Sequence, residues 1–169
     1  ALAKEKSIPS ITVSDACYER FSCLKSPEGV ALTYARPERE AGGLFSNKLR
    51  GVALAGVQDP GNAGAVARAA AAAGADALFA CEGSVDIFHP AFLRASMGAA
   101  FRIPVIALDQ DKLVKLAKGC GARLLAADAR QATDYREVDY TAPCIIVIGS
   151  EGGGVPDGLL NACAARARI

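Results

Sequence analysis

Residues 51–74 read GVALAGVQDPGNAGAVARAAAAAG, and this stretch decides the fold class. An apolar run over 51–57 passes through a turn rich in Pro, Gly and Asn into an alanine-rich segment. The pattern predicts a strand and then a helix over 62–73, with Asn62 as its N-cap and Gly74 as its stop. The helix face that packs on the sheet is expected to hold Val66, Ala69, Ala70 and Ala73.

The same order of strand and helix continues to the end of the chain. Further strands are predicted over 77–80, 103–108, 123–127, 144–148 and 165–169, and further helices over 90–99, 112–118 (ended by Gly119) and 156–162. The strands are apolar runs without alternation, which is typical of strands buried on both faces, and helices between strands indicate parallel pairing. The predicted class is therefore α/β, with a mainly parallel sheet and helices on both faces.

The first forty or so residues precede this pattern and differ from it. A helix capped by Ser14 or Asp15 and a strand over 30–34 are predicted there. The polar, glycine-bearing stretch REAGGLFSNK that follows suits a linker. We place a domain boundary near residue 45, which divides the chain into an N-terminal part, 1–44, and a main domain, 45–169.

The composition limits what the chain can do. Of the 169 residues, 51% are hydrophobic, which supports a packed core and excludes a disordered chain. A formal net charge of +1 does not indicate nucleic-acid binding by itself. If RNA is bound, it is held by a local patch or by charge in segments not present.

The cysteines and the single histidine do not form a metal-binding pattern. No two of the six cysteines make a C-x-x-C pair and His89 is the only histidine, so no metal site is predicted. Reduced thiols in a cytoplasmic protein are expected, with no signal peptide and no membrane span. The chain begins at Ala1 without Met and stops at Ile169 inside a predicted strand, so we expect a fragment.

Two glycine-bearing loops are candidate ligand sites. The first, QDPGNAG (58–64), opens a helix and exposes N–H groups that suit an anion, although it matches neither the dinucleotide fingerprint nor a P-loop. A tight turn and a ligand site are equally consistent with it. Arg68 projects outward from the helix that follows, as an ordinary solvated arginine also would.

The second loop, GSEGGG (149–154), follows the most apolar strand. Ligands of open α/β sheets bind beyond the carboxyl ends of strands, so a ligand role is favoured over a plain loop. Ser150 directly follows Gly149 and is therefore not the serine of a nucleophile elbow. Glu151 is expected to accept hydrogen bonds from a neighbouring loop. Elsewhere, His89 is expected to close a turn, and 94–99 indicates close packing.

Together these segments resemble the SpoU (TrmH-like) branch of the SPOUT methyltransferases. VQDPGNAGAVARAA (57–70) resembles the first motif of the family, and IIVIGSEGGGVPDGLL (145–160) resembles its second motif. LRASMGAAFRIPV (93–105) is similar to the family segment that precedes a strand between these two motifs. ARARI (165–169) would begin the third, which the chain does not complete. The match covers about residues 45–169, and residues 1–40 resemble, more weakly, the end of a preceding RNA-binding domain.

The resemblance implies a sheet tied in a trefoil knot, incomplete in this chain, and S-adenosylmethionine as cofactor. The implied cofactor contacts are Leu125, Ala126, Ala127, Gly149, Glu151, Gly152 and Ile169. The implied catalytic residues are Asn62, Arg68 and Glu151. A guanidinium is always protonated, so we expect Arg68 to stabilise the developing alkoxide and clamp a phosphate, with Asn62 orienting its loop and Glu151 positioning it. The fragment itself is expected to be inactive.

The implied reaction is methylation of a ribose 2′-hydroxyl in RNA, ribosomal RNA rather than transfer RNA, by a homodimer. A non-catalytic RNA-binding or assembly protein on the same scaffold is the alternative. A third interpretation, an unrelated α/β nucleotide-binding enzyme, predicts a preference for a nucleotide over S-adenosylmethionine.

Overall fold

The computed structural model describes residues 2–22, 29–35, 48–130 and 132–168. The chain folds as two compact units, residues 1–37 and 38–169. The predicted domain boundary near residue 45 falls outside the described residues and stays a prediction.

The N-terminal unit holds two short helices, α1 (Leu2–Glu5) and α2 (Asp15–Phe21). Ser14 is the N-cap of α2, and its hydroxyl accepts a hydrogen bond from the backbone N–H of Cys17. The predicted strand over 30–34 is wrong, because this segment is irregular. A strand forms only when a neighbour satisfies its backbone groups, and no described segment pairs with this one.

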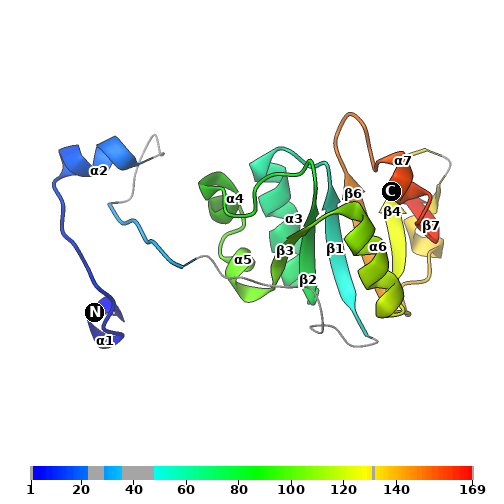
Figure 1. Ribbon diagram of the computed structural model, residues 1–169, viewed down its shortest axis with the longest axis horizontal. Helices are drawn as coiled ribbons and strands as arrows, with labels where there is room; N and C mark the ends of the chain where they lie inside the picture. Colours follow the sequence, from blue (N-terminus) through cyan, green and yellow to red (C-terminus); the bar gives the residue numbers. More distant parts are fainter. Residues whose placement is uncertain (1, 23–28, 36–47, 131, 169) are drawn as a thin grey trace. The chain divides into compact units, whose positions relative to one another are not determined.

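The main unit is built on a seven-stranded sheet (Figure 1) with the order β3-β2-β1-β6-β4-β7-β5. The strands are β1 (Arg50–Ala55), β2 (Ala77–Cys81), β3 (Val105–Leu108), β4 (Arg123–Ala127), β5 (Thr133–Asp134), β6 (Cys144–Gly149) and β7 (Ala165–Arg168). Every pairing within this sheet is parallel, as predicted. The short strand β5 and the 3₁₀ helix η1 (Tyr135–Glu137) were not predicted, because two polar residues carry no strand signal.

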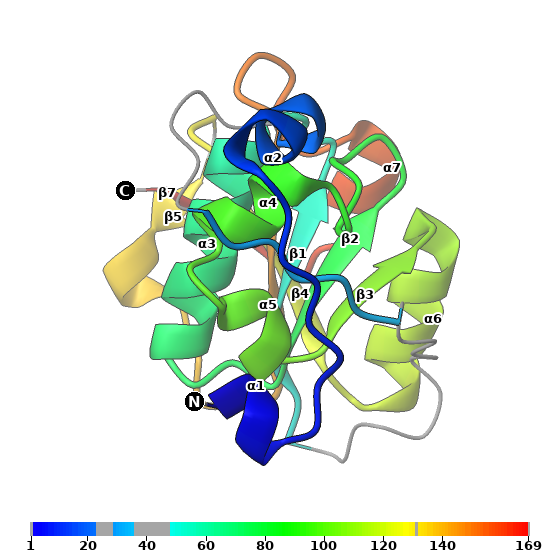
Figure 2. The same ribbon diagram turned by 90° about the vertical axis from the view of Figure 1, so that its left-hand side faces the viewer.

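Helices cover both faces of the sheet, which confirms the predicted layers. They are α3 (Pro60–Ala72), α4 (Pro90–Ala95), α5 (Ala99–Arg102), α6 (Gln110–Gly119) and α7 (Asp157–Leu160). Residues of α3 and α4 share one hydrophobic core with β1, β2 and β3, while residues of α6 and α7 share the other with β4 and β6. Figure 2 shows α3 and α6 on opposite sides of the sheet.

Helix α3 begins earlier than predicted, and its buried face is different. Pro60 occupies the first turn and Asp59 is the N-cap, so the assignment of the cap to Asn62 is wrong. Proline suits this position because it lacks an N–H that would go unpaired there. The buried residues of α3 are Ala63, Gly64, Ala67 and Ala70. Of the four residues predicted to face the sheet, only Ala70 is among them. In a run of alanines, several faces are equally apolar, so composition could not choose between them.

Two other predicted helices have different boundaries in the structure, and in both the chain turns at a glycine. The predicted helix over 90–99 is broken between α4 and α5, where Met97 and Gly98 have φ angles of 49° and 85°. Helix α6 includes Gly119, and the chain turns at Gly121, whose φ is 63°. Gly74 does follow the end of α3, with a φ of 76°. Left-handed backbone ends a helix, and it is found mostly at glycine. The trefoil knot stays a prediction.

Candidate functional site

The two glycine-bearing loops leave the sheet at the same edge. Strands β1 and β6 are parallel neighbours, and their last residues, Ala55 and Gly149, are register partners. The first loop follows β1 and the second follows β6, so both begin at the carboxyl ends of adjacent strands (Figure 1). This edge is where open parallel sheets bind their ligands.

A serine from the next strand connection fixes the start of the first loop. Gly56, with a φ of 84°, donates its N–H to Oγ of Ser84 over 2.9 Å, and that hydroxyl donates to the carbonyl of Leu54 over 3.0 Å. The backbone N–H of Val85 donates to the carbonyl of Val57. Sequence analysis missed Ser84 because its partners lie 28 and 30 residues away, and no local pattern reports such a contact.

The capping by Asp59 leaves the Asn62 side chain available for a different contact. Oδ1 of Asp59 accepts from the backbone N–H of Asn62 over 2.7 Å. The side-chain amide of Asn62 donates to Oε1 of Glu151, which comes from the second loop. The hydrogen bond expected between Glu151 and a neighbouring loop is therefore present, and it joins the two loops across 89 positions of sequence.

Close packing of helices supports the first loop from behind. A Cβ atom on Gly64 would lie 2.4 Å from Cβ of Ala95 and 2.8 Å from the backbone nitrogen of Ser96. Ser96 is fully buried, and its hydroxyl donates to the carbonyl of Leu93. The close packing predicted for 94–99 is confirmed, and its reason is the approach of α4 to the glycine of α3.

The second loop folds back on itself. Ser150 and Gly154 exchange both backbone hydrogen bonds, over 3.1 and 2.9 Å. Oγ of Ser150 also accepts from the backbone N–H of Gly153, which gives this serine a structural role. A Cβ atom on Gly149 would lie 2.0 Å from the carbonyl carbon of Gly154, so only glycine fits at the end of β6.

The end of β4 completes the same edge. Ala127 is the register partner of Ile148, directly before Gly149, and it is exposed. Leu125 and Ala126 are buried within the sheet, so their side chains belong to the core. Of the remaining predicted contacts, Gly152 is exposed in the second loop, while Ile169 lies outside the described residues.

A buried carboxylate follows β4, and sequence analysis missed it. Asp128 is 8% exposed, and its Oδ1 accepts from the backbone N–H and from Nε of Arg130, over 3.0 and 3.3 Å. The backbone N–H of Arg130 is the main cause that lowers the pKa of this carboxyl, against the opposing effect of burial. A charged residue directly after an apolar strand at the ligand edge was the signal that could have found it.

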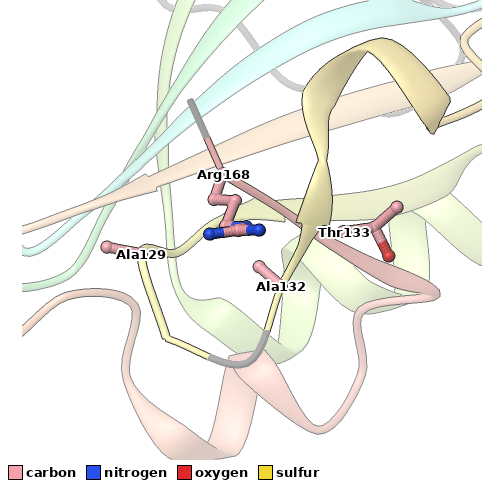
Figure 3. A pocket seen from close by; sticks show the side chains of 4 residues that line it. All are labelled: Ala129, Ala132, Thr133 and Arg168. Atoms are coloured by element: carbon pink, nitrogen blue, oxygen red, sulfur yellow. The ribbon is translucent and has the colours of Figure 1, made fainter.

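Beside Asp128 lies an open pocket of about 450 Å³. Figure 3 shows its lining by Ala129, Ala132, Thr133 and Arg168, with the Arg168 guanidinium reaching from β7 toward the loop after β4. The side chain of Arg136 lowers the pKa of the nearby Asp134 to about 2, and the charge of Arg168 contributes. Arginine side chains thus gather on this side of the edge.

The two remaining candidates lie outside the glycine-bearing loops. Arg68 is exposed on α3, and its position six residues after Asn62 places it about 9 Å farther along the helix axis. His89 is the N-cap of α4, where Nδ1 accepts from the backbone N–H of Ala91, so it closes a turn as expected. Within the described ranges, no three metal-ligating side chains gather, and no helix is long and apolar enough to cross a membrane.

Comparison with models of protein families shows which family this chain belongs to. Residues 50–169 match the model of the SpoU rRNA Methylase family. The chain belongs to this family. The match includes both glycine loops and the end of β4, so the candidate site described above lies within the part of the chain that matches the family.

Relatives of known or assigned activity agree with this membership. The chain is 28% identical over 157 residues to the 23S rRNA (guanosine(2553)-2′-O)-methyltransferase RlmP of Bacillus subtilis, covering 93% of this chain and 62% of that protein. Among solved structures it resembles an RNA 2′-O ribose methyltransferase, with a TM-score of 0.73 at 28% identity over 92% of this chain and 60% of that one.

A second solved structure is an AdoMet-bound rRNA methyltransferase from Sinorhizobium meliloti. Its TM-score is 0.69 at 33% identity, over 73% of this chain and 48% of that one. The structural neighbours are SPOUT methyltransferases, and the chain spans less than two thirds of the length of these relatives.

Proposed function

We propose that the full-length protein transfers a methyl group from S-adenosylmethionine to a ribose 2′-hydroxyl of RNA. The observation that carries the proposal is the hydrogen bond between Asn62 and Glu151, which joins the two family loops at the carboxyl edge of the sheet. The RlmP relative of Bacillus subtilis is a 2′-O-methyltransferase of 23S rRNA, which supports the same reaction here.

The residues at this edge fit the cofactor. Nothing lies within 4 Å of the Cβ position of Gly152, so the backbone of the second loop is open there, which suits a ligand held mainly by backbone groups. Ala127, Gly149 and Gly152 would hold it from β4 and the second loop. An orphaned oxygen of Asp128 points to a further ligand contact beside them. When bound, S-adenosylmethionine supplies an electrophilic methyl group on a sulfonium.

Side chains of this protein stabilise charge on the substrate and orient the first loop. A hydroxyl is a poor nucleophile at neutral pH, so negative charge developing on its oxygen must be stabilised. Arg68 carries a cationic guanidinium, is exposed and lies on the helix that starts at the first loop, which suits it to that oxygen and to a backbone phosphate. Glu151 holds Asn62, and Asn62 in turn orients the first loop.

Further parts of the proposal concern partners. Ribosomal RNA is the proposed substrate in preference to transfer RNA, with residues 1–44 as the end of an RNA-binding domain. The active form is proposed to be a cytoplasmic homodimer, which the exposed alanines of α3 suit.

Arg68→Ala in the full-length protein tests the proposal. Loss of a group that stabilises charge in the transition state typically lowers a rate by about 100-fold or more, while cofactor affinity should stay within about twofold. Methyl transfer to ribosomal RNA from a strain lacking the gene measures the rate, and calorimetry with S-adenosylhomocysteine measures affinity. Lys115→Ala, an exposed cation on α6, is the control and should keep wild-type turnover.

Wild-type turnover by Arg68→Ala would remove Arg68 from the mechanism. A wild-type protein that binds RNA without transferring methyl groups would support the non-catalytic alternative.

A further inference from the structure

The carboxylate of Asp128 occupies a position where a ligand is expected. Its backbone N–H donates to the carbonyl of Ala167, so the residue is fixed between the ends of β4 and β7. Ala127, directly before it, pairs with Ile148 of β6, and the second loop begins at the next residue of that strand. Asp128 therefore lies at the carboxyl edge together with both strands that flank β4.

One oxygen of this carboxylate has no hydrogen-bond partner. Oδ1 is satisfied by Arg130, but Oδ2 is buried and accepts nothing. Nη1 of Arg166 lies 3.9 Å from Oδ2, within range of an ion pair but too far for a hydrogen bond. A buried acceptor without a donor costs roughly 1–3 kcal/mol and more when charged, so its presence at a ligand edge calls for an explanation.

The arginines around Asp128 keep the carboxylate charged and in place. Arg130 holds Oδ1, and its guanidinium reaches the second loop, since a Cβ atom on Gly154 would lie 3.1 Å from Nη2. The side chain of Arg166 is 37% exposed and is long enough to turn away from Oδ2. The hydrogen bond from the Arg130 backbone lowers the pKa, so Oδ2 is an acceptor and not a donor at neutral pH.

We propose that Oδ2 of Asp128 accepts a hydrogen bond from a ribose hydroxyl of the bound cofactor once Arg166 turns aside. The inference rests on the proposed function and adds a specificity-determining residue to it. The nucleoside of S-adenosylmethionine offers two neighbouring ribose hydroxyls, and dinucleotide-binding α/β sheets likewise place an acidic side chain to accept from a ribose hydroxyl. The same pairing would discriminate against ligands that lack the hydroxyls.

Calorimetric titration of the full-length protein with paired nucleosides tests this assignment. 5′-Methylthioadenosine carries both ribose hydroxyls, and its 2′,3′-dideoxy analogue carries neither. Asp128→Ala should reduce the preference for the first ligand over the second by about tenfold or more, as expected for a hydrogen bond to a charged group. Asp134→Ala, which removes another arginine-paired carboxylate nearby, is the matched control and should keep the wild-type preference.

Each other outcome has a definite meaning. If Asp128→Ala weakens both ligands equally, or changes neither, the assignment is overturned while the proposed function stands. If the wild-type protein binds neither nucleoside nor S-adenosylhomocysteine, the proposed function fails and the assignment fails with it. Because the readout is a ratio of two affinities in one variant, a uniform loss of folded protein does not imitate the expected result.

Discussion

The two corners of the ligand edge are built in opposite ways. The first corner, residues 56–62, is held from outside, by Ser84 from the next strand connection and by Glu151 from the other corner. The second corner, residues 149–154, is held mostly from within, by the paired backbones of Ser150 and Gly154. The first is a loop clamped by distant side chains, whereas the second is a compact turn that depends on glycine.

This difference teaches why glycine is required at some positions and not at others. In the first corner, Gly56 needs glycine for its φ of 84°, whereas a Cβ atom on Gly61 would approach only the side chain of Asp59. In the second corner, a Cβ atom on Gly149 would collide with the backbone of Gly154 and Val155. Glycines within one glycine-rich motif thus differ widely in how much a side chain at their position would disturb the fold.

Gly149→Ala should have the largest effect. A Cβ atom 2.0 Å from a backbone carbonyl carbon forces the loop to move, at a cost of about 3 kcal/mol or more in the free energy of unfolding. Gly152→Ala is the control, because nothing lies within 4 Å of its Cβ position. Urea unfolding of both variants measures the difference. Equal stability would show that the second corner adapts, and the contrast between the corners would be lost.

Gly64→Ala should come next and should act on the support of the first corner. Its Cβ atom would lie 2.4 Å from that of Ala95, so α4 must shift away from α3, at a cost of about 1–3 kcal/mol. Gly119→Ala, at the end of α6 with nothing within 4 Å, should be neutral or slightly stabilising. Thermal unfolding compares the two variants. A stable Gly64→Ala protein would mean that the helices are not closely packed in solution.

The smallest effect should be the pH dependence that Asp134 and Asp128 contribute to stability. The pKa of Asp134 is lowered to about 2, first by the side-chain hydrogen bond from Arg136, and that of Asp128 is lowered too. The ordinary pKa of an aspartate in an unfolded chain is about 3.9, so the unfolded state takes up protons first. The stabilisation is complete above about pH 5 and is lost as the pH falls toward 2.

Asp134→Asn isolates this contribution. The variant should show a weaker fall in denaturation midpoint between pH 6 and pH 3 than the wild type, measured by guanidinium unfolding at each pH. An unchanged pH profile would show that the ion pair with Arg136 does not persist in solution.

Much of the chain's organisation followed from the order of its residues. The alternation of apolar runs and helices predicted a parallel α/β sheet, and two glycine loops after buried strands predicted the ligand edge. These patterns are local, because a strand buried on both faces must be apolar throughout and a tight turn must carry residues that permit it. Asn62 was also named as a candidate, and Glu151 was expected to accept a hydrogen bond from a neighbouring loop, although the donor was not identified as Asn62.

Only the tertiary structure decided which residues meet. The register that sets Ala55 beside Gly149 brings Glu151 to Asn62, and the packing of α3 selects Ala67 over Ala69 as a core residue. Ser84 became visible only in three dimensions, because its role depends on a partner from another strand, and the burial of Asp128 was likewise decided by the fold. Sequence patterns report the conformation of neighbours along the chain, whereas contacts across the sheet depend on strand order and register, which no single segment encodes.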